Sequence, residues 1–169
     1  MKPLLHKLLF FIILLSTVSY LPTAAQNFST RFLENVNSNS LSVVTVNASM
    51  IEAMKSQISD KKLLAFFDEL DFLRVITVKK NRTDAEIYYG ASIAMIKNIK
   101  GFQSLVSSQD GINRLEIMML PTAQGKAKEI VLISYDTNNL TIVNITGNIN
   151  IGKMSDLSSS LRKAFPNIN

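Results

Sequence analysis

The chain has 169 residues, a formal net charge of +5, no cysteine and a single histidine, His6. Without cysteines it cannot form a disulfide framework or a zinc–thiolate site, and no lipid anchor of the bacterial lipoprotein kind is expected. The lysines and arginines are scattered rather than gathered into a basic stripe with interleaved aromatic residues, so nucleic-acid binding is not expected.

The N-terminal segment has the three parts of a secretory signal: a short cationic start, the continuous apolar run 8–15, and small side chains before Gln26. We therefore predict a signal peptide over residues 1–25, cleaved between Ala25 and Gln26, and export to the periplasm or cell envelope. The alternative is an uncleaved membrane anchor, which needs ~20 apolar residues. The proline at position 22 weakens the end of the apolar stretch, and no stable membrane anchor is expected after cleavage.

The predicted mature chain, residues 26–169, contains neither cysteine nor histidine, because His6 lies in the signal. A Ser-His-Asp triad and a Cys-His pair are therefore excluded, as is imidazole ligation of a metal. Loss of two lysines with the signal lowers the net charge from +5 to +3. The length is that of one domain, and no cofactor is expected.

The beginning of this domain alternates between helical and strand patterns. Phe28–Val36 has amphipathic helical spacing, and Leu41–Val46 is rich in the β-branched residues typical of a strand. Ser49 and Glu52 have the spacing of a capping box and predict a helix that runs towards Ile58.

Two more helices and one strand complete the first half of the domain. One helix is predicted to begin at Ser59 or Asp60 and to carry Leu70 on its apolar face, and Leu73–Val78 is the second predicted strand. The other helix is long, starts with a second capping box and stops before a glycine. The residues that define it are Thr83, Glu86, Lys100 and Gly101.

The second half of the domain changes to strand patterns separated by turn residues. The four strand candidates are Phe102–Ser108, Arg114–Leu120, Glu129–Tyr135 and Leu140–Thr146. They predict an antiparallel meander, followed by a closing helix over Met154–Phe165. The predicted fold class is α+β, with helices packed mainly on one face of an antiparallel sheet; a mixed sheet is the alternative.

Three stretches of the chain carry a family resemblance. They are Val43–Met50, Leu70–Ile76, and Leu140–Ile151 followed by Met154–Leu157. With them the chain resembles the small exported proteins, found mainly in Bacteroidetes, that are known as domain of unknown function 4252. The resemblance implies an exported α+β domain and supplies no activity. Where the family often has an aspartate after the glycine of the last stretch, this chain has Asn148 and Asn150.

The segment Gly147–Lys153 has the spacing of a phosphate-binding loop. Met154 stands where such a loop needs a Ser or Thr for magnesium. Ile149 and Ile151 are β-branched where the loop must curl its N–H groups around a phosphate. We therefore interpret the segment as a strand end followed by the start of a helix.

Two further groups of residues could carry chemistry. Ser160 and Lys163 have Ser-x-x-Lys spacing, but the companion motifs of such acyltransferases are missing. Asp68, Glu69 and Asp71 could act as acids and bases or bind calcium, but no loop has EF-hand spacing. We interpret both groups as solvent-facing parts of helices.

The leading hypothesis is therefore a non-enzymatic exported module that binds an envelope protein or peptide through an exposed face or edge of its sheet. One alternative is a hydrolase that uses the carboxylates or the Ser–Lys pair. The other is a structural component of an envelope assembly.

Overall fold

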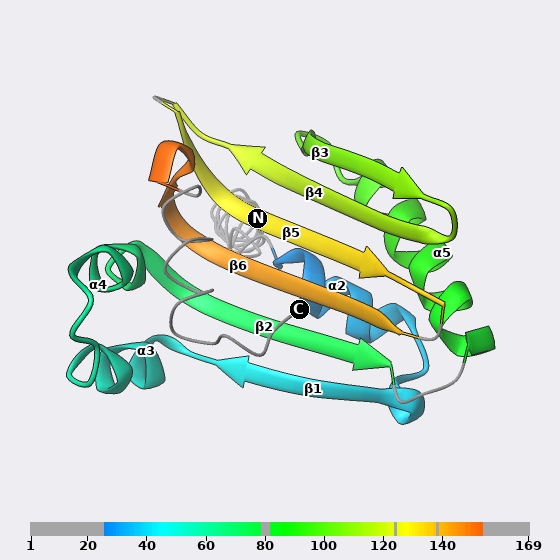
Figure 1. Cartoon of the computed structure of the whole chain (residues 1–169), viewed down its shortest axis with the longest axis horizontal. Coiled ribbons are helices and arrows are strands. Elements are labelled where there is room, and N and C mark those ends of the chain that lie inside the picture. Colours follow the sequence, from blue (N-terminus) through cyan, green and yellow to red (C-terminus); the bar gives the residue numbers. More distant parts are fainter. Residues whose placement is uncertain (1–25, 79–81, 124, 138, 154–169) are drawn as a thin grey trace, which may run out of the picture.

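The computed structural model describes residues 26–78, 82–123, 125–137 and 139–153 (Figure 1). Within these ranges, six strands form one antiparallel sheet in the order β1-β2-β6-β5-β4-β3. The strands are β1 Leu41–Val46, β2 Leu70–Val78, β3 Gln103–Asp110, β4 Asn113–Pro121, β5 Lys126–Tyr135 and β6 Leu140–Asn150. The meander predicted for the second half is confirmed, and no part of the described sheet is mixed.

Helices complete an α+β fold, as predicted. The four α-helices of the described residues are α2 Phe28–Asn35, α3 Ala48–Lys55, α4 Lys61–Phe67 and α5 Arg82–Asn98, and the short 3₁₀ turns are η2 Ser38–Ser40 and η3 Ile151–Lys153. In this part of the chain no helix is both long and apolar enough to span a bilayer. The predicted helix Met154–Phe165 lies outside the described residues.

The start of α3 corrects the predicted capping box. Asn47 is the N-cap, and its side-chain oxygen accepts a hydrogen bond from the Met50 N–H over 3.0 Å. Ser49 therefore lies inside the helix, and Glu52 binds Lys55 at 2.6 Å instead of reaching back to a cap. Asparagine is as good an N-cap as serine, and here it comes two residues earlier.

The start of α4 at Asp60 is confirmed, because the Asp60 carboxylate accepts hydrogen bonds from the N–H groups of Lys62 and Leu63 at 2.8 and 3.1 Å. The predicted end of this helix is wrong. The helix stops at Phe67, and Leu70 is the first residue of β2, paired with Gly147 of β6. Pairing with a strand that lies far along the chain has overridden the helical spacing.

The long helix α5 begins at Arg82, so Thr83 lies within its first turn rather than at its cap. It ends at Asn98, and Gly101 follows with a φ of 99°. This left-handed conformation favours glycine and confirms Gly101 as the stop signal.

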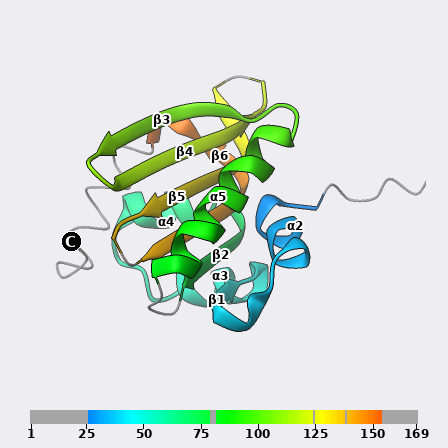
Figure 2. The ribbon, with the colours of Figure 1, turned by 90° about the vertical axis from the view of Figure 1, so that its right-hand side faces the viewer.

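The main hydrophobic core lies between the sheet and the pair α2 and α5, which lie on the same side of it (Figure 2). Its largest fully buried members come from both helices and from β2, β5 and β6: Phe28, Phe32, Ile76, Ile96, Ile133, Leu140 and Ile142. A second cluster joins α3 and α4 to the opposite face of the sheet at one end. Most helical residues therefore cover one face, and the other face is covered only at that end by helices of the described residues.

Candidate functional site: the open face of the sheet

Strand geometry decides which side chains lie on the less covered face. Successive residues of a strand point to opposite faces. On β1, Leu41 is buried in the core beneath α2 and α5, so Val44 points to the opposite side. We call the side of the sheet opposite α2 and α5 the open face.

A line of apolar side chains crosses the whole open face. Each residue is the direct antiparallel partner of the next, in the order Val44, Val75, Val143, Leu132, Ile117 and Val106. The two ends are exposed, with Val44 at 59% and Val106 at 40%, and the four central side chains are half-buried. We call these six residues the apolar row. Five inter-strand spacings make it about 24 Å long.

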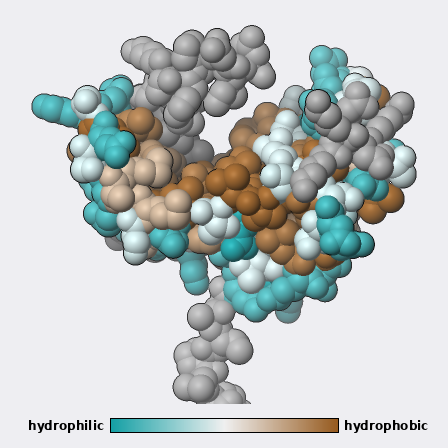
Figure 3. Space-filling model, turned by 90° about the horizontal axis from the view of Figure 1, so that it is seen from below, coloured by the Kyte–Doolittle hydropathy of each residue, from teal (hydrophilic) through white to brown (hydrophobic). Residues whose placement is uncertain are grey.

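The two flanks of the apolar row differ in chemistry. On one side the next register line carries mostly hydroxyl groups and forms the hydroxyl row: Ser42, Thr77, Thr141, Ser134, Leu115 and Ser108. On the other side Val46, Ile145, Ile130 and Met119 belong to the core cluster under α3 and α4, and Ile117 of the apolar row packs against the same cluster. The apolar row is thus a strip one side chain wide between a packed core and a polar border. Figure 3, seen from the β1 side, shows hydrophobic residues gathered across the middle and hydrophilic ones at the margins.

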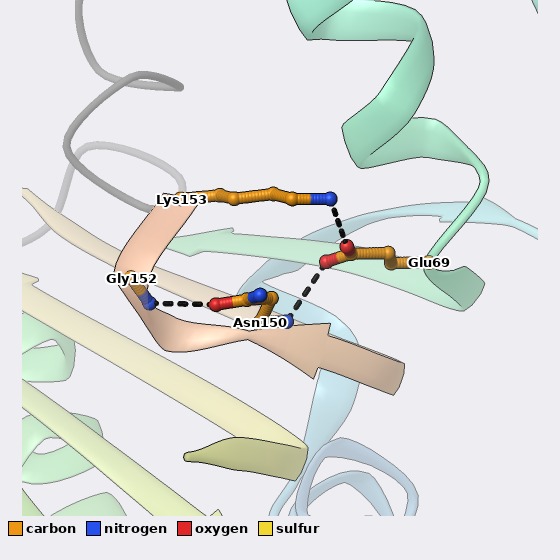
Figure 4. Close-up of polar contacts among 4 residues, drawn as sticks. All are labelled: Glu69, Asn150, Gly152 and Lys153. Carbon is orange, nitrogen blue, oxygen red and sulfur yellow. Dashed lines mark hydrogen bonds and ion pairs between the residues drawn. The ribbon is translucent and has the colours of Figure 1, made fainter. Parts of the chain in front are cut away.

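The segment Gly147–Lys153 closes one corner of the sheet and binds a carboxylate of its own chain (Figure 4). The Asn150 N–H donates to Glu69 Oε2 over 2.8 Å, and Lys153 Nζ donates to Glu69 Oε1 over 2.7 Å. The Asn148 N–H donates to the Glu69 carbonyl oxygen over 2.9 Å. Glu69 therefore occupies the donors that a phosphate would need. The segment is the end of β6 followed by η3, as its β-branched residues predict.

Competing effects set the pKa of Glu69. Partial burial on its own would raise it, but the hydrogen bonds from the Asn150 N–H and Lys153, together with the charges of Lys153 and Lys126, lower the pKa below its usual value. Glu69 is therefore a charged structural partner of Lys153.

The three clustered carboxylates do not form a site. Asp68 pairs with Lys55 at 3.0 Å, Glu69 pairs with Lys153, and Asp71 is exposed. Among the described residues, no three His, Cys, Asp or Glu side chains are close enough to hold a metal ion.

The remaining predicted site residues lie at or beyond the ends of the described chain. Ser160 and Lys163 lie outside it, as does Ala25. Gln26 is the first described residue; it is exposed, and its side chain donates to Glu34 over 3.1 Å.

A groove of about 900 Å³ lies between α2 and α5, on the side away from the open face. Met95 of α5 and Ile99, which follows this helix, share the lining of the groove with Arg31 and Glu34 of α2. Both charged groups already bind Gln26, since Arg31 donates to its carbonyl oxygen over 3.1 Å and Glu34 accepts from its side chain. The two charged side chains of this groove therefore already have partners within the chain.

A buried polar network that sequence reasoning missed holds the start of α2 on the sheet. Glu129 Oε1 accepts hydrogen bonds from the Phe28 N–H at 2.6 Å and from Asn144 Nδ2 at 2.8 Å. Asn144 Oδ1 accepts from the Ser29 N–H at 3.1 Å. Glu129 is 6% exposed and Asn144 is fully buried. The available signal was a polar residue, Glu129 or Asn144, that follows or precedes apolar residues at every second position of its strand.

This network predicts a pH dependence of stability. Burial raises the pKa of Glu129, although the hydrogen bonds from Phe28 and Asn144 oppose the rise. The folded state therefore holds the proton more tightly than the unfolded chain. The stability that this carboxyl contributes is full below its ordinary value of 4.5 and is lost as pH rises through its folded pKa. Glu69 acts oppositely, because its contribution is lost as pH falls below 4.5 through its lowered pKa.

Glu129→Gln removes the titrating proton but keeps an oxygen that accepts from Phe28. We expect the free energy of unfolding of this variant to fall less than that of the wild type as pH rises above 4.5. Urea unfolding of both proteins between pH 4 and 8 measures the difference. Equal pH slopes would show that the buried carboxyl does not titrate in this range.

The family model described as domain of unknown function (DUF4252) matches residues 34–157, which is most of the chain. No curated protein matches the chain.

Proposed function

The chain belongs to the family of domain of unknown function DUF4252, and from this premise we propose that it is an exported, non-enzymatic module that binds one amphipathic helix of an envelope protein. The binding surface in this proposal is the open face. The observation that carries it is the apolar row, which crosses all six described strands with its two ends exposed.

The dimensions of the apolar row favour a helix as the occupant. A helix of about 16 residues has the length of the row, at a rise of 1.5 Å per residue. The apolar residues of an amphipathic helix recur every three or four positions and form a single stripe along its length, which suits a single row of apolar side chains. The hydroxyl row would then face the polar border of the helix. A facing sheet would need an inner surface that is apolar over several rows.

The chemistry of the surface supports contact rather than catalysis. None of the twelve positions in the apolar and hydroxyl rows carries a charged residue. The two carboxylates that the fold orients, Glu69 and Glu129, are both used to hold backbone N–H groups of the chain itself. The cationic, apolar and small-residue parts of segment 1–25 support export.

A charge placed on the apolar row tests the proposal. We expect Val106→Lys to reduce binding about tenfold, because the partner's helix would have to desolvate the new ammonium group. The readout is a photo-cross-linking amino acid at Thr141, on the open face, in the full chain in intact cells. The yield of a discrete adduct is compared between variants, and the cross-linked peptide of the partner is identified.

Ser107→Lys is the matched control, because the neighbouring residue points to the other face and pairs with Glu116. It should leave the adduct yield within twofold, and urea unfolding should show that both variants fold. Equal losses in the two variants, or adducts only with an extended segment of the partner, would contradict helix binding at the open face.

A further inference from the structure

The strand β1 forms one edge of the described sheet and lacks the usual protection of an edge. Its six residues, Leu41–Val46, include no charge and no proline. Its register with β2 is uninterrupted, whereas each of the other four strand pairs in the described sheet contains a shift. Proteins commonly protect exposed edges with charges, prolines or bulges, because a regular edge is a template for another strand.

The opposite edge provides a contrast within the same sheet. The register of β3 with β4 shifts between Ser104 and Val106, and the strand ends at Asp110. A shift and a charge both hinder the addition of a further strand. Of the two edges of the described sheet, β1 is therefore the one suited to strand pairing.

The exposed fractions of the β1 residues indicate where an added strand would be centred. Leu41 is buried, whereas residues 42–45 are exposed. Val44, at 59%, is the most exposed large hydrophobic residue on any described strand. β1 lies along the lower border of the sheet in Figure 1, and Figure 3 views the molecule from that side.

We infer that β1 pairs antiparallel with β1 of a second copy of this chain, with the twofold axis at Val44. Residues directly opposite each other in an antiparallel pair share a face, so a symmetric pair must be centred on a residue. Centring on Val44 uses residues 42–46 and leaves the buried Leu41 outside. Val44 then lies against Val44 of the partner subunit on the open face, and the apolar row continues from one copy into the next.

The second copy is favoured as occupant because this edge is complementary to itself. An uncharged strand meets its own copy without like charges opposite each other, and paired β-branched side chains are favourable across strands. An edge-to-edge contact buries less than the ~800 Å² per partner of a standard interface, so we expect a weak dimer with a dissociation constant of about micromolar. The inference rests on the backbone of the edge, and Val44 is the one residue of the apolar row that it uses.

The absence of cysteine from the chain allows a direct test. In the full chain, expressed with residues 1–25 so that processing is retained, Val44→Cys should form a disulfide-linked dimer under mild oxidation. Directly opposite Cβ atoms lie ~4.5–5.5 Å apart, close to what a disulfide requires. Leu105→Cys on β3, 37% exposed, is the control and should cross-link at least about tenfold more slowly.

Sedimentation equilibrium provides a second readout that needs no cross-link. The average mass of the wild type should rise towards that of a dimer between about 1 and 100 μM. Val44→Lys should remain monomeric at concentrations tenfold above those at which the wild type dimerises, because two ammonium groups would meet at the axis. Val106→Lys should dimerise like the wild type. A wild type that is monomeric throughout, equal cross-linking of the two cysteine variants, or linkage of Val44→Cys to a different protein would overturn the inference.

Discussion

Replacing Gly147 with alanine is expected to lower the free energy of unfolding by roughly 3 to 5 kcal/mol. A Cβ atom at this position would lie 2.0 Å from the carbonyl oxygen of Glu69 and 3.0 Å from the Cα of Leu70. Both atoms belong to the backbone, so neither can move away as a flexible side chain would. The end of the β2–β6 pairing, including the hydrogen bond from the Asn148 N–H to Glu69, must open. Urea unfolding of the wild type and the variant measures the loss.

Gly90→Ala is the matched control for this substitution. Gly90 lies on α5, and a Cβ built there meets no atom within 4 Å. Alanine should be tolerated or should raise stability by up to ~1 kcal/mol, because it is the better helix former. If Gly147→Ala unfolded within 1 kcal/mol of the wild type, the close approach of β6 to Glu69 would be refuted.

Replacing Asn144 with alanine is the second change with a large expected effect, a loss of roughly 2 to 4 kcal/mol. The Asn144 amide joins the Ser29 N–H to Glu129, and all three groups are buried. Without it, Ser29 keeps an unsatisfied N–H and the buried carboxylate loses a donor. Urea unfolding gives the loss, and amide hydrogen exchange should show faster exchange at the first turn of α2.

Asn148→Ala serves as the comparison, because Asn148 is exposed and lies four residues further along the same strand β6. This variant should stay within about 0.5 kcal/mol of the wild type. Equal losses for the two asparagines would mean that the side chain of Asn144 does not anchor α2.

This anchor and the open face lie on opposite sides of the sheet. Glu129 and Asn144 hold α2, whose first turn follows closely on the predicted cleavage site after Ala25. The apolar row lies on the other side. A variant in the anchor and a variant in the row therefore test separate points, namely the stability of the fold and the proposed binding of a partner.

Local sequence determined the elements whose signals are contained within a few residues. The β-branched run over Leu41–Val46 is a strand with those bounds, because its composition and alternation suit a pleated surface. Asp60 begins α4, and Gly101 follows α5 with a positive φ, because a cap or stop depends on neighbouring backbone groups. Together with the four strand patterns and turn residues of the second half, these elements sufficed for the α+β class and the four-strand meander.

Only the tertiary structure decided which distant residues meet. Leu70 fits a helical face by its spacing, but its pairing with Gly147 makes it the start of β2. The apolar row depends on the registers of five strand pairs, and a shift of one residue in any of them would turn its side chains to the other face. Glu129 is identified as an anchor only when α2 docks above it. Registers and burial are non-local, because they arise from contacts between segments that the chain order separates.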